Sequence, residues 1–456
     1  MTVRKRMHLA VRLPGLGGTT AGTGRRSGSP VDFAAFERLA RTAERGLFDF
    51  LLLTGGERSG ETEGRVHDPD TVGRPEAVTV LNALAAVTER LGLAATVDTV
   101  SHQPYELARR LATLDHLSEG RAAWNIVTST VAATAENFRR GSRPDTTGRH
   151  PVAAEFVEVS RELWDSWTPD GVSRQVAHRG RHFDVSGEFT VPRPPQGHPV
   201  LIHAGDSPAG RDFAVRAADV VLAGQGAGHR LPGRQGSRQD TLEAGRAFYA
   251  EVKGRLAAHG RSPEELKIMP LVTYVLGDTA AEARERAAAI RREQIPPRNA
   301  VGTPERSRGA GFSSGDPDGP LPAVDPGLGP PPAVDPDLGP LPAQGRATAT
   351  GVLTVAEKRW ARAREKAPPV RQTVIEASRH PTFVGTPESV AAELDEFVRT
   401  GAADGFVLVP RATPGALEEF VDRVVPLLQE RGVFRTAYTD TTLRSHLGLA
   451  EPIWKG

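Results

Sequence analysis

The sequence predicts an α/β protein built on a (β/α)8 TIM barrel, and three observations support this fold class. Eight short apolar segments alternate in strict order with longer segments of helical periodicity. The apolar segments are near-continuous hydrophobic runs, which is typical of parallel strands that are buried on both faces. The chain has 456 residues, the length of a barrel that carries insertions. A closed parallel barrel therefore fits the pattern better than an open, doubly wound sheet.

Each predicted strand is followed by a helix whose apolar residues recur at three- and four-residue spacing. In the first helix, Phe33, Phe36 and Leu39 follow this spacing and Gly46 supplies a stop signal. The predicted strands are residues 8–13, 48–53, 93–99, 122–128, 199–204, 219–223, 268–276 and 405–409. The predicted helices are residues 29–46, 75–92, 103–117, 150–167, 210–217, 241–259, 279–292 and 414–430. A small hairpin over residues 180–192 is expected outside the barrel.

One segment departs from this alternation. Residues 295–350 are rich in Pro, Gly and Ala, and contain a ten-residue tandem repeat, LPAVDPGLGP followed by PPAVDPDLGP. Such a composition buries too little apolar surface to offset the entropic cost of ordering the chain. We expect a mobile loop inserted between strands seven and eight of a single domain that spans residues 1–456. It is either a low-complexity insertion without function or a lid over the active site.

Composition narrows the classes of function. Lys and Arg total 57 and Asp and Glu total 56, so the net charge of +1 predicts no electrostatic attraction to nucleic acid or to an anionic membrane. The chain contains no cysteine, which excludes disulfides, thiolate metal sites and cysteine nucleophiles. No P-loop and no His-Glu-x-x-His motif occurs, and we predict no metal site. Without a secretory signal or a membrane span, we expect a cytoplasmic protein whose redox chemistry would require a bound cofactor.

Polar clusters are predicted at the carboxyl ends of three strands, where barrels place their active sites. The strongest is IHAGDSPAG, residues 202–210, in which a strand leads through Gly205 to Ser207 at the cap of a helix and Pro208 at its first turn. Free backbone amides and the positive end of the helix dipole favour an anion such as phosphate there. By itself the pattern fits a plain capped helix equally well.

Two further clusters follow the same logic. WNIVTST, residues 124–130, ends the fourth strand, and TVDTVSHQPY, residues 96–105, ends the third. Their polar side chains either bind a ligand or satisfy the backbone of the loops. These side chains are Asn125, Thr128, Ser129, Asp98, Thr99 and His102. His102 is either a catalytic base or an ordinary loop histidine.

Taken in order along the chain, these segments resemble one protein family. RLGLAATVDT, QPYELARRLATLDHLSEGRAAWNIVTS, EFVEVSRELWDSW, GRHFDVSGEFTVPRPPQGHPVLIHAGDSPAGRDFA and LRSHLGL are similar to the nitrilotriacetate, dibenzothiophene-sulfone and pristinamycin-type branch of the bacterial luciferase-like flavin monooxygenases. The resemblance covers nearly the whole chain except the Pro/Gly-rich insertion. It implies a (β/α)8 barrel with FMN lying across its carboxyl-terminal mouth.

The resemblance also implies an activity. In this family reduced FMN (FMNH2) is delivered by a separate NAD(P)H:flavin reductase and reacts with O2 to give a C4a-peroxyflavin, which oxygenates a small organic substrate. The enzymes are usually homo-oligomers. Two alternatives stay open: an F420-dependent oxidoreductase of the same fold, which transfers hydride, and a non-catalytic flavin-binding barrel. The sequence does not identify the substrate.

The resemblance assigns cofactor-binding residues by position. Those matching the family's phosphate loop are Gly205, Ser207 and Gly210, and those matching the strand ends beside the flavin ring are Asp98, Thr99, Asn125, Val127, Thr128 and Ser129.

The chain also departs from the family pattern. Gly55 replaces an expected Asp, and Asp206 stands where a small or amide residue is common. Thr146 and His150 stand where the family has a His and a Tyr near the cofactor, and His150 could replace the Tyr as a hydrogen-bond donor. His102 and His150 are the candidate catalytic bases. The resemblance also implies that Thr146, His150 and Asp206 lie near FMN.

Overall fold

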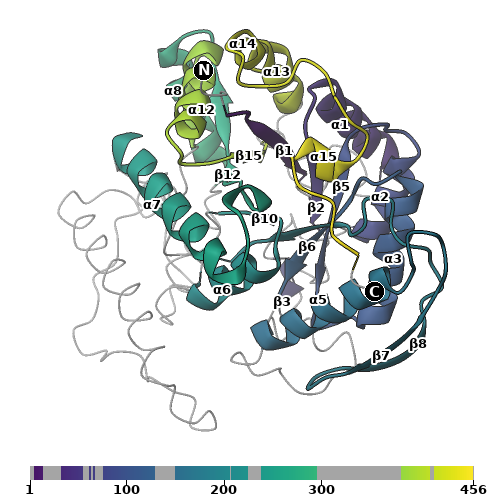
Figure 1. Cartoon of the computed structure of the whole chain (residues 1–456). Helices are drawn as coiled ribbons and strands as arrows, with labels where there is room; N and C mark the ends of the chain where they lie inside the picture. The colour runs from purple at the N-terminus through teal and green to yellow at the C-terminus, as the bar shows by residue number, and fades with distance from the viewer. Residues whose placement is uncertain are drawn as a thin grey trace, which may run out of the picture. The chain divides into compact units, whose positions relative to one another are not determined.

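The computed structural model describes residues 5–13, 32–54, 61–62, 65–66, 75–128, 149–205, 207–223, 238–294, 382–410 and 415–454. Two compact units divide the chain, one formed by residues 1–284 with 381–456 and the other by residues 285–380. The architecture given below is that of the first unit (Figure 1). The predicted insertion at 295–350 lies outside the described residues. Within the described ranges, no helix is long and apolar enough to span a membrane.

Parallel strands form the central layer. Their order in the sheet is β11-β10-β9-β6-β5-β2-β1-β15-β12. The strands are β1 (His8–Leu13), β2 (Phe50–Thr54), β5 (Gly92–Asp98), β6 (Ala122–Val127), β9 (Val200–His203), β10 (Val220–Val221), β11 (Lys267–Ile268), β12 (Leu271–Val272) and β15 (Gly405–Leu408). Every pairing in this sheet is parallel, as expected for strands joined by helices.

The sheet closes on itself through β11 and β12, which occupy its two ends and are separated in the chain only by Met269 and Pro270. On one side the Met269 amide donates to the Val221 carbonyl at 2.9 Å, and on the other the Val407 amide donates to the Pro270 carbonyl at 3.0 Å. Residues 267–272 therefore act as one strand between β10 and β15, interrupted where Pro270 lacks an N–H. The described strands thus form a barrel of eight positions, which confirms the predicted fold class.

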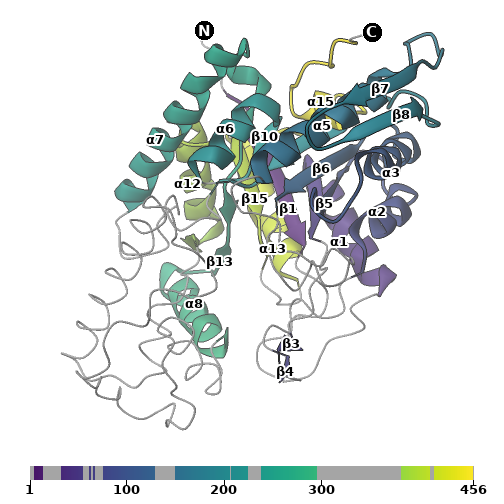
Figure 2. The ribbon, with the colours of Figure 1, turned by 90° about the horizontal axis from the view of Figure 1, so that it is seen from below.

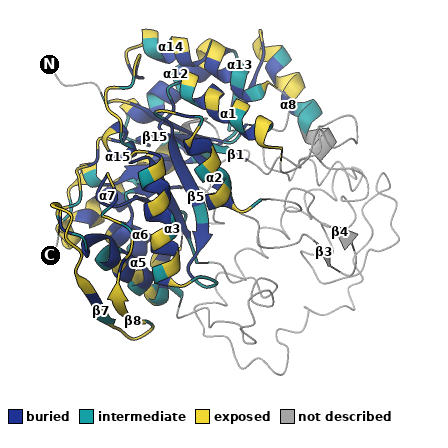
Figure 3. Ribbon diagram, turned by 90° about the vertical axis from the view of Figure 1, so that its right-hand side faces the viewer, coloured by how far each residue is buried: buried dark blue, intermediate teal, exposed yellow. Residues whose placement is uncertain are grey.

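Helices surround the strands (Figures 1 and 3). They are α1 (Phe33–Arg45), α2 (Ala77–Ala85), α3 (Pro104–Leu117), α5 (Arg149–Asp165), α6 (Pro208–Ala217), α7 (Arg238–Leu256), α12 (Pro387–Arg399), α13 (Ala416–Arg423) and α14 (Val425–Glu430), while α8 (Ala280–Gln294) spans the boundary between the two units. Apolar residues at helical spacing produce a buried stripe on each helix. In α1 this stripe includes Phe36, Ala40 and Ala43.

Alternation along the strands divides the core into two parts. Ala10 and Leu52 point into the barrel, where they pack in an interior cluster, whereas Leu9 and Val11 face the helices. The interior cluster also contains Leu443, the first residue of the short helix α15 (Leu443–His446), whose amide donates to the Gly120 carbonyl just before β6. Helix α15 therefore closes the amino-terminal end of the barrel and leaves the carboxyl-terminal end for a site.

Some predicted boundaries were wrong. The helix predicted over 75–92 ends at Ala85, because the buried guanidinium of Arg121 binds the carbonyls of Ala85, Thr88 and Leu91 and holds this segment out of the helix. The predicted hairpin lies earlier, as β7 (Gln175–Arg179) and β8 (Asp184–Glu188), and runs beside α5 outside the barrel (Figure 2).

The carboxyl-terminal half contains further differences. The strand predicted over 268–276 is divided, because β13 (Tyr274–Leu276) leaves the barrel sheet and pairs with β14 (Phe383–Gly385). Neither β14 nor α12 was predicted. The final helix is broken at Val424. Pro426, two residues later, has no backbone N–H and cannot donate the hydrogen bond that a continuous helix needs.

A separate antiparallel pair in the amino-terminal half consists of β3 (Glu61–Thr62) and β4 (Arg65–Val66).

Candidate active site

The three predicted polar clusters meet at one edge of the barrel. Strands β5, β6 and β9 are neighbours in the sheet, and their carboxyl ends lie side by side. The register pairs Asp98 with Val127 and Ile126 with His203, so the ends of all three strands lie at similar height. Segments that are far apart in sequence therefore come together at the carboxyl-terminal mouth of the barrel, where a single site is a prediction.

The loop after β5 is held by Asp98. Its Oδ1 accepts the amides of Val100 at 2.8 Å and Ser101 at 2.7 Å, and its backbone carbonyl lies 3.2 Å from Nδ1 of His102. The Oδ2 atom lies 3.9 Å from the same ring nitrogen. Asp98 therefore acts first as an anchor for the loop that carries His102, one of the two candidate bases. Whether either residue also contacts a cofactor stays a prediction.

Two buried polar atoms at these strand ends have no partner. Asn125 donates from Nδ2 to Thr96 Oγ1 at 3.0 Å, but its Oδ1 is buried without a hydrogen bond. Thr99 donates its amide to the Val127 carbonyl at 3.1 Å, and its buried hydroxyl likewise has no partner. Because buried polar groups are normally paired, two such atoms on adjacent strands indicate a place where a polar ligand supplies the missing contacts.

The loop from β9 to α6 forms a close backbone cradle. Ser207 caps the helix by accepting the Gly210 amide at 3.0 Å, and Pro208 occupies the first turn. A Cβ added to Gly205 would lie 3.1 Å from the Gly210 Cα and 2.3 Å from Nε2 of His203. Only glycine permits this approach at position 205. The first turn of α6 therefore presents its amide end beside a compact loop, an arrangement suited to an anion.

His203 is a site residue that the sequence analysis missed. Its Nδ1 lies 3.1 Å from the Ile126 carbonyl, its ring packs 4.8 Å from the ring of Phe213, and its buried Nε2 has no partner. Burial lowers the pKa of His203 to about 4, so the ring is neutral at pH 7. With the proton on Nδ1 facing the carbonyl, Nε2 directs a lone pair at Gly205. The signal in the sequence is its place within IHAGDSPAG, directly before the predicted phosphate loop.

His150 lies near this loop rather than near the β5 end of the site. It is the second residue of α5, and its ring centroid lies 6.5 Å from that of His203 and 6.4 Å from that of Phe213. Burial and the adjacent positive charge of Arg149 lower its pKa. The Arg149 guanidinium donates to the Thr128 carbonyl at 3.3 Å, which ties the start of α5 to the end of β6.

Several predicted site residues lie outside the part of the chain that the structure describes. They are Gly55, Ser129, Thr146 and Asp206. Among the described residues, no group of His, Asp and Glu side chains is arranged to hold a metal ion.

The donor and acceptor set fits a phosphate-bearing flavin. The Gly205–Gly210 cradle and the amide end of α6 suit the phosphate, whereas Asn125 Oδ1 and Thr99 Oγ1 suit polar edges of a ring system. The apolar barrel interior beneath these groups provides a dry floor. A bound cofactor would supply the redox chemistry, because the chain contains no cysteine thiols.

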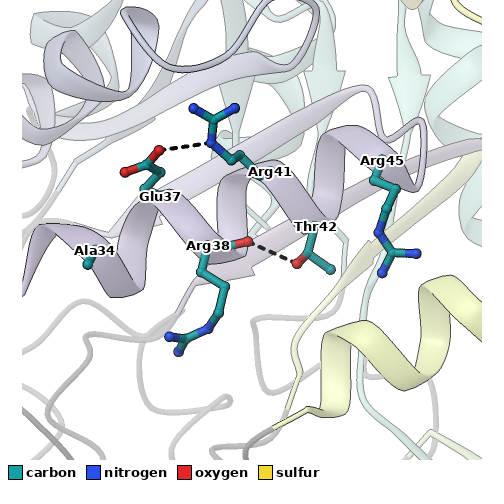
Figure 4. Close-up of a pocket in the computed structure, with 6 residues that line it drawn as sticks. All are labelled: Ala34, Glu37, Arg38, Arg41, Thr42 and Arg45. Carbon is teal, nitrogen blue, oxygen red and sulfur yellow. Dashed lines mark hydrogen bonds and ion pairs between the residues drawn. The ribbon is translucent and has the colours of Figure 1, made fainter.

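A surface depression elsewhere does not compete with this site. It has a volume of about 410 Å³ and lies along the outer helix α1 (Figure 4). Its lining residues are Ala34, Glu37, Arg38, Arg41, Thr42 and Arg45. The arginines pair with carboxylates, Arg41 with Glu37 at 2.8 Å and Arg45 with Asp422, so the depression contains no unbalanced charge cluster that would mark a catalytic site.

Comparison with known proteins adds independent evidence. The family model described as luciferase-like monooxygenase matches residues 10–404. Nitrilotriacetate monooxygenase component A of Aminobacter aminovorans is 36% identical over 92% of this chain and 91% of its own length. Dibenzothiophene-sulfone monooxygenase of Rhodococcus erythropolis (strain XP) is 35% identical over 100% of this chain and 99% of its own. The structure of EDTA monooxygenase from Chelativorans sp. BNC1 superposes with a TM-score of 0.71 at 28% identity, covering 99% of this chain and 100% of that one.

Proposed function

The chain belongs to the luciferase-like monooxygenase family, and on this premise we propose that it is a two-component monooxygenase that uses reduced FMN and O2 to oxygenate a small organic substrate. A separate NAD(P)H:flavin reductase would supply the reduced FMN. The name of the nitrilotriacetate relative, component A, describes one part of a system with more than one component, which supports this division of labour.

One observation carries the proposal for the cofactor: a glycine cradle at the start of α6 lies beside strand ends with unpaired polar atoms. Reduced FMN, when bound, supplies the electrons that activate O2. The amide end of α6 would bind its phosphate, and Asn125 Oδ1 and Thr99 Oγ1 would orient its ring. The apolar interior layer beneath these groups would exclude water from the reacting atoms.

The other predicted cofactor contacts and the two candidate bases are part of the same proposal. Cofactor contacts are expected from Asp98, Val127, Thr128, Ser129, Thr146 and Asp206 in addition to the residues named above. His102 and His150 are the candidates for moving a proton. Anchoring of the His102 loop by Asp98 and the half-buried position of His150 at the start of α5 support these candidates.

Anaerobic titration of the full-length protein with photoreduced FMN, followed by rapid mixing with O2, tests the proposal. We expect saturable binding and a rate of flavin reoxidation that differs clearly from that of free reduced FMN. The control is the same titration with reduced riboflavin, which lacks the phosphate and should bind more weakly. No binding of FMN together with binding of F420 would contradict the proposal, as would FMN binding that leaves reoxidation by O2 unchanged.

A further inference from the structure

His203, at the end of β9, faces a small space that the missing side chain of Gly205 leaves open. Ile202 belongs to the interior cluster, so the next residue, His203, points the other way, towards the helices. There its ring packs against the ring of Phe213 in α6, with the two centroids 4.8 Å apart. An ideal Cβ at position 205 would lie 2.3 Å from His203 Nε2 and 3.1 Å from the Gly210 Cα. This space, the Gly205 niche, is therefore bordered by Nε2 and by the first turn of α6.

The hydrogen bonds of His203 define what its free nitrogen can do. Nδ1 lies 3.1 Å from the Ile126 carbonyl, which can only accept, so Nδ1 carries the proton of the ring. Nε2 is then an acceptor, and it is buried without a partner. Burial lowers the pKa of His203 to about 4, which keeps the ring in this neutral form at pH 7. A ligand atom that meets Nε2 must therefore bring a hydrogen.

This requirement distinguishes between the parts of a flavin nucleotide. A phosphate ester is mainly a dianion at pH 7, and its oxygens accept hydrogen bonds, which suits the backbone amides at the start of α6. The ribityl chain that joins the phosphate to the ring carries hydroxyl groups, which can donate. His203 lies between the places proposed for phosphate and ring. It comes two residues before Gly205 on β9, and its partner Ile126 directly follows Asn125 on the neighbouring strand β6.

We propose that Nε2 of His203 accepts a hydrogen bond from a hydroxyl of the ribityl chain, which enters the Gly205 niche beside the phosphate. The inference rests on the proposed function and assigns His203 to the part of the cofactor between phosphate and ring. It also gives position 205 a second reason to be glycine, because a side chain there would occupy the place of the hydroxyl.

The test is a fluorescence titration of the full-length protein with oxidised flavins. The ligands are FMN, riboflavin and an FMN analogue with a phosphorylated pentyl chain, which keeps the phosphate but lacks the chain hydroxyls. His203→Phe removes the acceptor and keeps a flat ring, while His203→Gln keeps an acceptor oxygen. If circular dichroism shows that His203→Phe does not fold, His203→Met replaces it. His116→Phe is the matched control, because His116 lies at the end of α3 and contacts the Pro192 carbonyl outside the candidate site.

We expect His203→Phe to weaken the binding of FMN and of riboflavin by a similar factor, about tenfold, because a chain hydroxyl loses its acceptor. The affinity for the hydroxyl-free analogue should not change. His203→Gln should lose less than His203→Phe, and His116→Phe should bind all three flavins like the unmodified protein.

An unchanged affinity of His203→Phe for FMN would overturn the inference, and so would an equal loss with the hydroxyl-free analogue. A loss for FMN alone, with riboflavin unaffected, would assign His203 to the phosphate instead and also overturn it. If the unmodified protein does not bind FMN, the proposed function itself is refuted, and the inference with it.

Discussion

At the scale of single residues, the site is marked by polar atoms that the protein itself does not satisfy. Elsewhere in the described core, buried charges are closely paired, as in the contacts of Asp49 with His8 and Arg435. At the ends of β5, β6 and β9, Thr99 Oγ1, Asn125 Oδ1 and His203 Nε2 are buried without partners, as are single atoms of other residues such as Arg435 Nε and Arg444 Nε. Each such atom costs stability on its own, and the three at these neighbouring strand ends are placed where a bound ligand would contact them.

Gly205→Ala tests the cradle. The added methyl would approach His203 Nε2 and the Gly210 Cα too closely, so the loop must shift away from α6. We expect FMN affinity to fall about tenfold or more, measured by quenching of flavin fluorescence, with the circular dichroism spectrum unchanged. Gly254→Ala is the control, because the glycine lies in α7 and its added Cβ would meet nothing within 4 Å. Equal FMN affinity in both variants would show that the cradle does not bind the cofactor.

His203 should make stability depend on pH. Burial lowers its pKa from 6.5 to about 4, so between these values the unfolded chain binds more protons than the folded one. Stability is therefore lost as pH falls from 6.5 towards 4, by on the order of 3 kcal/mol at about 1.4 kcal/mol per pH unit.

The measurement compares urea unfolding of the unmodified protein and His203→Gln between pH 7 and pH 4. The variant should show a shallower loss of stability, because its amide does not titrate. Burial also lowers the pKa of His198 and His446, and these residues titrate in both proteins. The contribution of His203 is therefore the difference between the two pH curves of unfolding free energy. Parallel pH curves for the two proteins would exclude this role for His203.

At the scale of elements, one buried side chain defines the turn between α2 and β5. The guanidinium of Arg121 donates to the Ser118, Leu91, Ala85 and Thr88 carbonyls, and also to the Thr88 hydroxyl. The Ala85, Thr88 and Leu91 carbonyls lie at the end of α2 and in the turn after it, and Ser118 caps the end of α3, where the backbone lacks its own donors. Burial lowers the pKa of Arg121, but as a guanidinium it stays charged.

Arg121→Met is expected to destabilise the protein by about 3 kcal/mol, because the buried carbonyls lose their donors. Urea unfolding at pH 7 would measure the change. Arg110→Met is the control on neighbouring α3, where the arginine forms partly exposed ion pairs with Glu76 and Glu106 and should matter by less than about 1 kcal/mol. Similar losses in the two variants would argue against the capping role.

At the scale of the whole barrel, three aspartates join neighbouring strands at the amino-terminal end. Asp49 accepts the Leu9 amide at 2.8 Å, and Asp219 accepts the Leu201 amide at 2.9 Å. Asp404 accepts the Ile268 amide at 2.7 Å. The last contact lies where residues 267–272 close the sheet against β15. Structural ion pairs thus gather at the amino-terminal end of the barrel, opposite the strand ends that form the candidate site, the division expected of this architecture.

Asp404→Ala should weaken closure of the barrel. The carboxylate pairs with Lys5 at 2.7 Å and Lys253 at 3.1 Å, and accepts from Tyr249 at 3.0 Å, so its removal leaves a buried lysine uncompensated. We expect a loss of about 3–5 kcal/mol in the free energy of unfolding, measured with urea. Asp422→Ala, which breaks the exposed pair with Arg45, should cost less than about 1 kcal/mol. A loss at Asp404 no larger than this control would contradict the assigned role in closure.

The sequence by itself determined the order of the eight barrel strands, the barrel class and the helix cap at Ser207. These depend on local signals: apolar periodicity, glycine and proline positions, and residues that cap their own helix. It also indicated which strand ends carry polar groups. Position along the chain is sufficient for that inference, because every strand of a parallel barrel ends at the same face.

Only the tertiary structure decided which side chains act together. His203 looks like an ordinary strand residue in the sequence, and its position depends on the Ile126 carbonyl, which belongs to a neighbouring strand. The end of α2 is likewise set by a distant residue, Arg121. The strand predicted over 268–276 is divided because β13 pairs with β14. Register between strands and the burial of a polar atom are long-range properties, so no local pattern in the chain specifies them.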